Sequence, residues 1–236
     1  MSRSPAVALA PGVWRIPTAG RALVNSYALV DDDGSVTLVD CGLKRAPARI
    51  VRGLAAIGKT PADVIRIVLT HAHPDHAGGA AELARRTGAP VVAHSADTEY
   101  ARAGQAPPRD PTVSGARLFA RLDGGRFPAV DVAQPLSDGD VLPVAGGLRV
   151  VHTPGHSPGH VSLLHEPTRL LITGDALFNV AGIRWSVKLL CTDFRMTQRT
   201  AHVLGELDYD IAAFTHGPEL TENAREQVRG FLRRQR

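Results

Sequence analysis

The stretch Val64-Ile-Arg-Ile-Val-Leu-Thr-His-Ala-His-Pro-Asp-His76 decides the fold and the chemistry of this chain. Its first six residues form an apolar run broken by one arginine, and such a run predicts a buried strand. The potential metal ligands His71, His73, Asp75 and His76 come directly after it. Imidazole and carboxylate are ligands of zinc and of the neighbouring transition metals. The stretch therefore predicts a strand that ends at a metal site.

The same layout, an apolar strand followed by a ligand-type residue, occurs three more times. The strands and the residues after them are 148–151 with His156, 170–173 with Asp175, and 211–214 with His216. Strand ends at one edge of a sheet converge in space, and the glycines beside these residues let the backbones approach closely. We therefore expect one site assembled from four strand ends.

The rest of the chain predicts alternating strands and helices in a single domain over residues 1–236. Further strands are expected at 13–16, 22–30, 36–39, 64–69, 90–93, 141–151 and 161–165, and helices at 47–57, 77–86, 197–207 and 221–234. Each half opens with strands, which favours an α/β layered fold. Prolines and glycines repeatedly break residues 95–134. This pattern predicts a loop and helix excursion, with a short helix at 114–122, that serves as a substrate lid.

Composition limits the partners. The formal net charge is +4, but the arginines are scattered apart from those in the tail 229–236, so no nucleic-acid partner is expected. No segment approaches the roughly 18 apolar residues of a membrane span, and the N-terminus has no convincing signal-peptide core. The two cysteines, Cys41 and Cys191, lie far apart in the sequence, which favours reduced thiols. We expect a cytoplasmic protein with a small-molecule substrate and no membrane partner, and the sequence does not predict its oligomeric state.

With these motifs in order, the chain resembles the metallo-β-lactamase superfamily over residues 13–217. The matching segments are His71–His76, Thr153–His156, Gly174-Asp175 and Thr215–Gly217. Asp40 matches the acidic residue that precedes the first ligand motif of the family. The resemblance implies a four-layer αββα sandwich with two mixed β-sheets.

The resemblance also implies two metal sites. One would use His71, His73 and His156, the other Asp75, His76 and His216, with Asp175 bridging them. Three imidazoles suit zinc, while the second set is richer in carboxylate and also suits iron or manganese. We therefore expect two Zn²⁺ per chain, with Fe or Mn as alternatives at one or both sites. Asp40 and His160 are expected to hydrogen-bond the ligand loops, with direct ligation as the alternative for His160.

The activity that the resemblance implies is hydrolysis by a metal-bound hydroxide, because a metal pair lowers the pKa of bound water from about 15.7 to about 7. Asp75 would orient that hydroxide and move its proton. Some β-lactamases of the fold carry Cys at the place of Asp175, so the aspartate favours the glyoxalase II and lactonase-like branch. The expected substrate is a small thioester, lactone or ester. Arg184, Lys188 and Arg195 are candidates to contact an anionic group on it.

Three other activities stay open. β-Lactam hydrolysis would favour an exported protein. A mononuclear iron persulfide dioxygenase would leave His216 and the rest of the second ligand set superfluous. A nuclease of the family would carry an inserted domain that this length does not accommodate. Only twenty residues follow His216, so the C-terminal helical region that binds glutathione in glyoxalase II is not expected.

Overall fold

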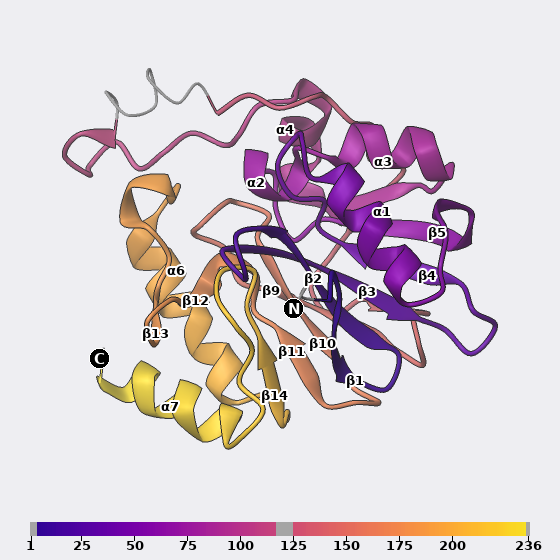
Figure 1. Ribbon diagram of the computed structural model, residues 1–236. Coiled ribbons are helices and arrows are strands. Elements are labelled where there is room, and N and C mark those ends of the chain that lie inside the picture. The colour runs from indigo at the N-terminus through magenta and orange to yellow at the C-terminus, as the bar shows by residue number, and fades with distance from the viewer. Residues whose placement is uncertain (1–3, 117–124, 235–236) are drawn as a thin grey trace.

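Two mixed β-sheets lie face to face in the computed structural model, which describes residues 4–116 and 125–234 (Figure 1). Helices cover the outer face of each sheet. The order of layers is therefore helix, sheet, sheet, helix, and the predicted four-layer αββα sandwich is confirmed.

The first sheet contains seven strands in chain order. These are β1 (Val7–Ala10), β2 (Val13–Ala19), β3 (Val24–Val30), β4 (Val36–Val39), β5 (Val64–Val68), β6 (Val91–His94) and β7 (Gln134–Leu136). Strands β1 to β4 pair antiparallel, and β4 to β7 pair parallel. The parallel half places the carboxyl ends of β4, β5 and β6 at one edge.

The second sheet has the order β14-β11-β10-β9-β8. Its strands are β8 (Val141–Leu142), β9 (Leu148–His152), β10 (Val161–His165), β11 (Leu170–Ile172) and β14 (Ile211–Ala213). Strand β10 is antiparallel to both β9 and β11, while β11 and β14 are parallel. Strands β9, β11 and β14 therefore end at the same edge. A separate hairpin, β12 (Leu177–Asn179) and β13 (Ile183–Trp185), follows β11.

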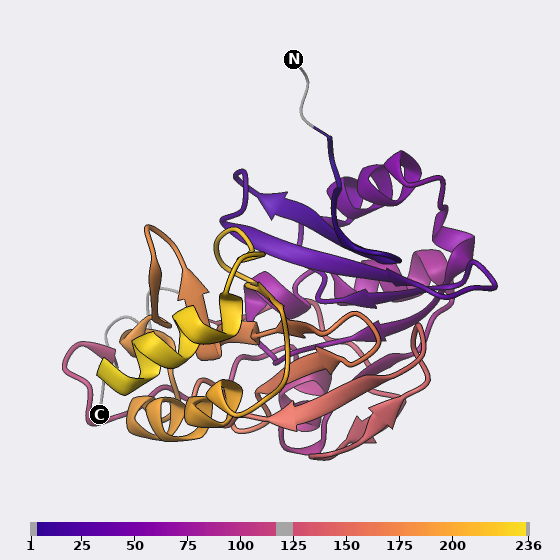
Figure 2. The ribbon, with the colours of Figure 1, turned by 90° about the horizontal axis from the view of Figure 1, so that it is seen from below.

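The helices divide between the two outer faces. The described α-helices are α1 (Pro47–Ala56), α2 (Pro74–Ala77), α3 (Ala80–Thr87), α4 (Thr98–Ala103), α6 (Phe194–Thr200) and α7 (Ala224–Arg234). In the described part of the chain, 3₁₀ turns accompany them at η1 (Pro61–Asp63), η2 (Ser95–Asp97), η3 (Gly174–Ala176), η4 (Lys188–Leu190) and η5 (Ala201–Gly205). The purple helices α1 and α3 lie on one side of the molecule, and the orange and yellow helices α6 and α7 on the other (Figures 1 and 2). None of the helices described is long and apolar enough to cross a membrane.

Three apolar clusters correspond to the three spaces between the four layers. Successive residues of a strand point to opposite faces of the sheet, so a strand covered on both sides is apolar throughout. In β5, Ile67 packs into the cluster under α1 and α3, and Val68 into the cluster between the sheets. In α7, Val228 and Phe231 pack on the outer face of the second sheet. This double burial explains the apolar residues Ile67 and Val68, whereas Ile65 near the start of the strand is 46% exposed.

The predicted helix 221–234 begins at Ala224, and two other predicted helices differ more from the structure. The predicted helix 77–86 is interrupted at Gly78-Gly79, where the backbone N–H of Gly79 donates to the carbonyl of Gly42 at 3.0 Å. The loop of Cys41 passes so close that a Cβ at Gly79 would lie 2.3 Å from the Cys41 carbonyl oxygen. The predicted helix 197–207 begins earlier, at Phe194, because the Asp193 side chain accepts the backbone N–H of Met196 and caps it. It continues as the 3₁₀ turn η5. Most of the predicted helix 114–122 lies outside the described residues, whereas α4 occupies the start of the 95–134 excursion.

Candidate metal centre

Seven side chains that follow four strands meet where the edges of the two sheets adjoin. They come from the loop and helix after β5 and from the segments after β9, β11 and β14: His71, His73, Asp75, His76, His156, Asp175 and His216. Three groups of them bring their ligand atoms within 4.8 Å of one another: His71 with His73 and His156, His71 with His76 and Asp175, and Asp75 with His76 and His216. The structure thus brings together every residue that was predicted as a ligand.

The Asp175 carboxylate lies between the imidazoles of the two candidate ligand sets. Its Oδ2 is 3.2 Å from His156 Nε2 and 3.4 Å from His216 Nε2. Its Oδ1 is 3.3 Å from His76 Nε2. The central position of this carboxylate matches the role of a bridging ligand.

The donor atoms have the spacing and the chemistry that metal ions require. Ligand atoms 2.0–2.1 Å from one tetrahedral ion lie about 3.3 Å apart. Across this cluster, His73 Nδ1 lies 2.9 Å from His156 Nε2, and His216 Nε2 lies 3.3 Å from Asp75 Oδ2. Among the described residues, no group hydrogen-bonds the buried Nε2 of His71. An unsatisfied buried nitrogen is costly, and a metal ion would satisfy it. The residues present therefore fit a metal centre.

The charge balance of the cluster points the same way. Burial lowers the pKa of His71 and His73 well below the usual value, which keeps both imidazoles neutral with a lone pair to offer. Burial also opposes protonation of His76, but the carboxylates of Asp175 and Asp75 overcome it and hold the pKa of His76 well above its usual value. The buried carboxylates require positive charge beside them, and cations supply it.

Asp40 orients one of the candidate ligands from behind. It follows β4 and adopts a left-handed backbone conformation, with φ of 58°, which is uncommon outside glycine. Its Oδ2 accepts a hydrogen bond from His76 Nδ1 at 2.8 Å, and its Oδ1 accepts one from the backbone N–H of Thr70 at 2.8 Å. When a metal cation takes the place of the second proton, Nδ1 keeps its proton for Asp40, and the lone pair of His76 Nε2 points into the centre. This is the arrangement that the predicted supporting role of Asp40 requires.

His160 contacts the candidate bridging residue through the backbone. Its Nε2 accepts the backbone N–H of Asp175 at 2.7 Å, and its Nδ1 lies 2.9 Å from the carbonyl oxygen of Thr153. Because Nε2 accepts, the proton is on Nδ1. Burial lowers the pKa of His160 to about 3, in keeping with a neutral ring. Both nitrogens are thus engaged, which favours the predicted hydrogen-bonding role over ligation.

Asp97 is a supporting residue that sequence reasoning missed. It lies in η2, directly after β6, and joins two ligand loops. It accepts hydrogen bonds from the backbone N–H of Ala72 at 2.8 Å, from Ser157 Oγ at 2.6 Å and from the backbone N–H of Gly159 at 2.6 Å. Its position after a strand end, like that of the ligands, is the signal that identifies it in the sequence.

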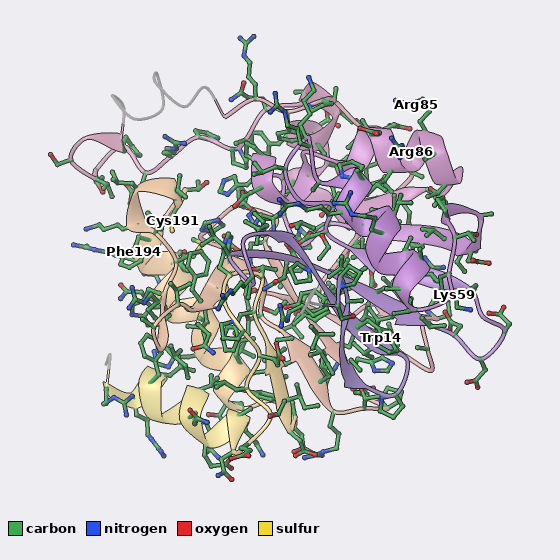
Figure 3. All side chains as sticks on the ribbon, in the orientation of Figure 1. Trp14, Lys59, Arg85, Arg86, Cys191 and Phe194 are labelled. Atoms are coloured by element: carbon green, nitrogen blue, oxygen red, sulfur yellow. The ribbon has the colours of Figure 1, made fainter. Side chains whose placement is uncertain are left out.

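Cys191 is a second missed residue. Its buried Sγ lies 3.5 Å from His156 Nδ1, the nitrogen that faces away from Asp175. The backbone around it fixes the same loop, since the N–H of Thr192 donates to the carbonyl of His156 and the N–H of Asp193 to that of Gly155. Figure 3 shows Cys191 near Phe194 in the orange part of the chain. No spacing in the sequence indicates this contact, because it depends on how the segment folds back.

A pocket of about 400 Å³ opens onto the centre, and we call it the substrate pocket. It is lined by Leu23, Val24, Leu43, His73, Pro74, Asp75, Ala106, Arg109, Leu190 and His216. Ala106 and Arg109 come from the 95–134 excursion, so part of the predicted lid does border the site. The predicted anion contacts Arg184, Lys188 and Arg195 are not among the described residues that line it. The pocket is largely apolar, and Arg109 contributes a positively charged side chain to its lining.

Comparison with known proteins agrees with this geometry. The family model described as the metallo-beta-lactamase superfamily matches residues 19–218. A probable metallo-hydrolase, YybB, of Bacillus subtilis is 27% identical over 204 residues, which cover 86% of this chain and 84% of the relative. A hydroxyacylglutathione hydrolase of Rhodopseudomonas palustris is 32% identical over 155 residues, which cover 65% of this chain and 48% of the relative. The solved structure of a metallo-beta-lactamase family protein from Thermus thermophilus aligns with a TM-score of 0.72 at 29% identity, covering 97% of this chain and 80% of that one.

Proposed function

The chain belongs to the metallo-β-lactamase superfamily and is a metallohydrolase, and from that premise we propose that it is a dinuclear enzyme acting on a small thioester, lactone or ester. The observation that carries the proposal is the central position of Asp175 between two sets of ligand atoms. We propose that His71, His73 and His156 hold one zinc ion and Asp75, His76 and His216 the other, with Asp175 shared. A bound metal pair supplies hydroxide at neutral pH and polarises a carbonyl oxygen.

A side chain of the protein must accept and pass on the proton during hydrolysis, and we assign this role to Asp75. The Asp75 side chain is 30% exposed and lines the substrate pocket, whereas the Asp175 side chain is 3% exposed. Asp75 is therefore the carboxylate that a substrate can reach. Its Oδ2 lies 3.3 Å from His216 Nε2, and against the opposing effect of desolvation, His76 together with His216 lowers the pKa of Asp75, so the carboxylate is ionised.

The lining of the substrate pocket favours a substrate with a small apolar acyl group and an anionic group. Leu23, Leu43 and Leu190 form its apolar wall, and Arg109 lies on the same pocket. An arginine beside an apolar wall recognises a carboxylate or phosphate on an otherwise apolar molecule. A thioester agrees with the name of the relative hydroxyacylglutathione hydrolase, of which this chain spans about half the length.

A substrate panel with metal analysis tests the proposal. We expect about two zinc ions per chain and turnover of a thioester, a lactone or an aryl ester from a panel that also includes a β-lactam and a phosphodiester. Chelation should abolish turnover and added Zn²⁺ should restore it. Full activity of metal-free protein would overturn the metallohydrolase mechanism. A single iron with oxygen consumption would instead establish the dioxygenase alternative.

A further inference from the structure

A second cavity, of about 520 Å³, lies on the other side of the β2–β3 turn and is surrounded by arginines. Its lining residues are Ser4, Pro5, Val7, Arg15, Pro17, Gly20, Arg21, Arg49 and Arg52. We call it the arginine pocket. It shares no lining residue with the substrate pocket: Gly20 and Arg21 face one cavity, and Leu23 and Val24, on the same turn, face the other. It is therefore a separate site.

The buried arginine of this pocket is held in a fixed orientation. Arg15 is 7% exposed, and its Nε donates to Glu219 Oε2 at 2.7 Å. Its Nη1 donates to the carbonyl of Arg21 at 3.2 Å and to Asn25 Oδ1 at 3.3 Å. A guanidinium fixed in this way loses little conformational entropy when it binds a ligand.

The other three arginines converge on the same volume from different elements. Arg49 and Arg52 are one turn apart on α1 and so share a helix face, while Arg21 comes from the turn after β2. Arg49 Nη1 donates to the carbonyl of Thr18 at 2.8 Å, which directs the Arg49 guanidinium towards the end of β2. Within residues 4–116 and 125–234, Glu219 is the one carboxylate that ion-pairs with any of the four arginines. The pocket therefore has an excess of positive charge.

We propose that the arginine pocket binds a small organic molecule that carries two or more phosphate groups. Converging positive charges repel one another and attract a multivalent anion, and guanidinium groups bind phosphate oxygens in bidentate fashion. The volume is that of a small-molecule site, and Pro5, Val7 and Pro17 provide apolar surface for the organic part. The concave shape favours a small molecule over nucleic acid, which would require an extended basic stripe.

Calorimetric titration with fructose 1,6-bisphosphate tests the proposal, with fructose as the uncharged control. The protein is used with its metals. The test variant is Arg21→Gln/Arg52→Gln, since both side chains are exposed and the substitutions remove two charges from the pocket. The matched control is Arg85→Gln/Arg233→Gln, which removes two exposed charges from α3 and α7, and Figure 3 shows Arg85 on α3, near Arg86. His216→Ala reports binding of phosphate at the metal centre.

We expect bisphosphate binding that is at least tenfold weaker in Arg21→Gln/Arg52→Gln, within twofold of the native value in the control pair, and retained in His216→Ala. No binding by the native protein at millimolar bisphosphate would overturn the proposal. Unchanged binding by the pocket variant, or its loss in His216→Ala, would do the same. A single-stranded oligonucleotide that binds more tightly than the bisphosphate through Arg21 and Arg52 would assign the surface to nucleic acid instead.

Discussion

The metal centre and the substrate pocket adjoin each other, yet they are built in different ways. The candidate ligands follow strand ends and are supported from behind by buried groups such as Asp40 and Asp97. The wall of the pocket comes from turns and loops, and its leucines remain partly in contact with solvent, with Leu23 58% and Leu43 46% exposed. A rigid scaffold thus fixes the chemistry, while variable loops select the substrate. Substitutions in the two regions should therefore affect different kinetic constants.

The largest effect is expected at the candidate ligands themselves. His71→Ala and Asp75→Ala should each lower kcat/KM by about 10³-fold or more, because each removes a proposed metal ligand and Asp75 is also the residue that we assign to proton transfer. Circular dichroism should show that the fold is kept, since three apolar clusters surround the sheets. Metal analysis should show fewer than two ions per chain. Native turnover by either variant would contradict the assigned ligand set.

The next largest effect is expected at Asp97, which hydrogen-bonds the loops that carry the candidate ligands. Asp97→Asn places an amide NH₂ group against backbone N–H donors of Ala72 or Gly159, so one hydrogen bond between the two ligand loops is lost. Metal affinity should fall by about 10- to 100-fold. Asp131→Asn is the control, because that side chain is 84% exposed and lies outside the centre. Equal metal affinity in the two variants would show that the loops do not need Asp97.

The ligand residues could be predicted from the sequence because each one is marked locally. An apolar run, a glycine and a histidine or aspartate occur together at the ends of β5, β9, β11 and β14. The sandwich followed from the family resemblance and from the alternation of elements. These features depend on short-range patterns, which a single sequence records directly.

Some of the supporting and selecting residues could not be predicted, because their contacts depend on distant segments. Cys191 contacts His156 from 35 positions along the chain, and Arg109 joins a pocket whose other residues range from Leu23 to His216. Lys188 was predicted as one of the candidates to contact an anionic group on the substrate. In the structure, its ammonium group lies 5.8 Å from the ring centroid of Phe194 instead. Only the fold brings such residues to the site or keeps them from it.

In the substrate pocket, Arg109→Gln should change selectivity and leave the chemistry intact. For an ester that carries a carboxylate, KM should rise by about tenfold, which corresponds to about 1.4 kcal/mol of binding. For the matched neutral ester, KM should stay within twofold, and kcat should change little for either. Arg109→Lys should show a smaller rise, because lysine keeps the charge and loses the fork geometry. An equal rise for both esters would show that Arg109 supports the loop and does not bind the anion.

A smaller effect is expected from the apolar wall. Leu43→Ser removes apolar contact with the acyl group, but the leucine is already 46% exposed, so only part of its surface is buried by a substrate. The burial lost corresponds to about one methylene group, or about 0.8 kcal/mol, so KM for a long-chain ester should rise about three- to fourfold. The matched acetyl ester should be unaffected. Equal effects on the two esters would contradict a role for Leu43 in acyl-group binding.

The smallest effect concerns His94, which ends β6 and is not a candidate metal ligand. His94 stacks on His152 with ring centroids 3.9 Å apart, between the two sheets. Burial, together with His152, lowers the pKa of His94 to about 4, against about 6.5 for an unfolded chain. Between those pH values the unfolded chain binds the additional proton, so this contribution to stability is complete above pH 6.5 and is lost as the pH falls towards 4.

His94→Phe keeps an aromatic ring in the stack and removes the titration. The free energy of unfolding of the native protein should therefore fall more steeply than that of the variant between pH 6.5 and 4, as measured by urea denaturation at matched metal content. The metal ligands titrate in both proteins, so the difference between the two curves isolates His94. Parallel curves would show that His94 is protonated equally in the folded and unfolded chains. The stacked pair would then be no more sensitive to acid than a solvated histidine, and the acid sensitivity of the fold would belong to the metal centre alone.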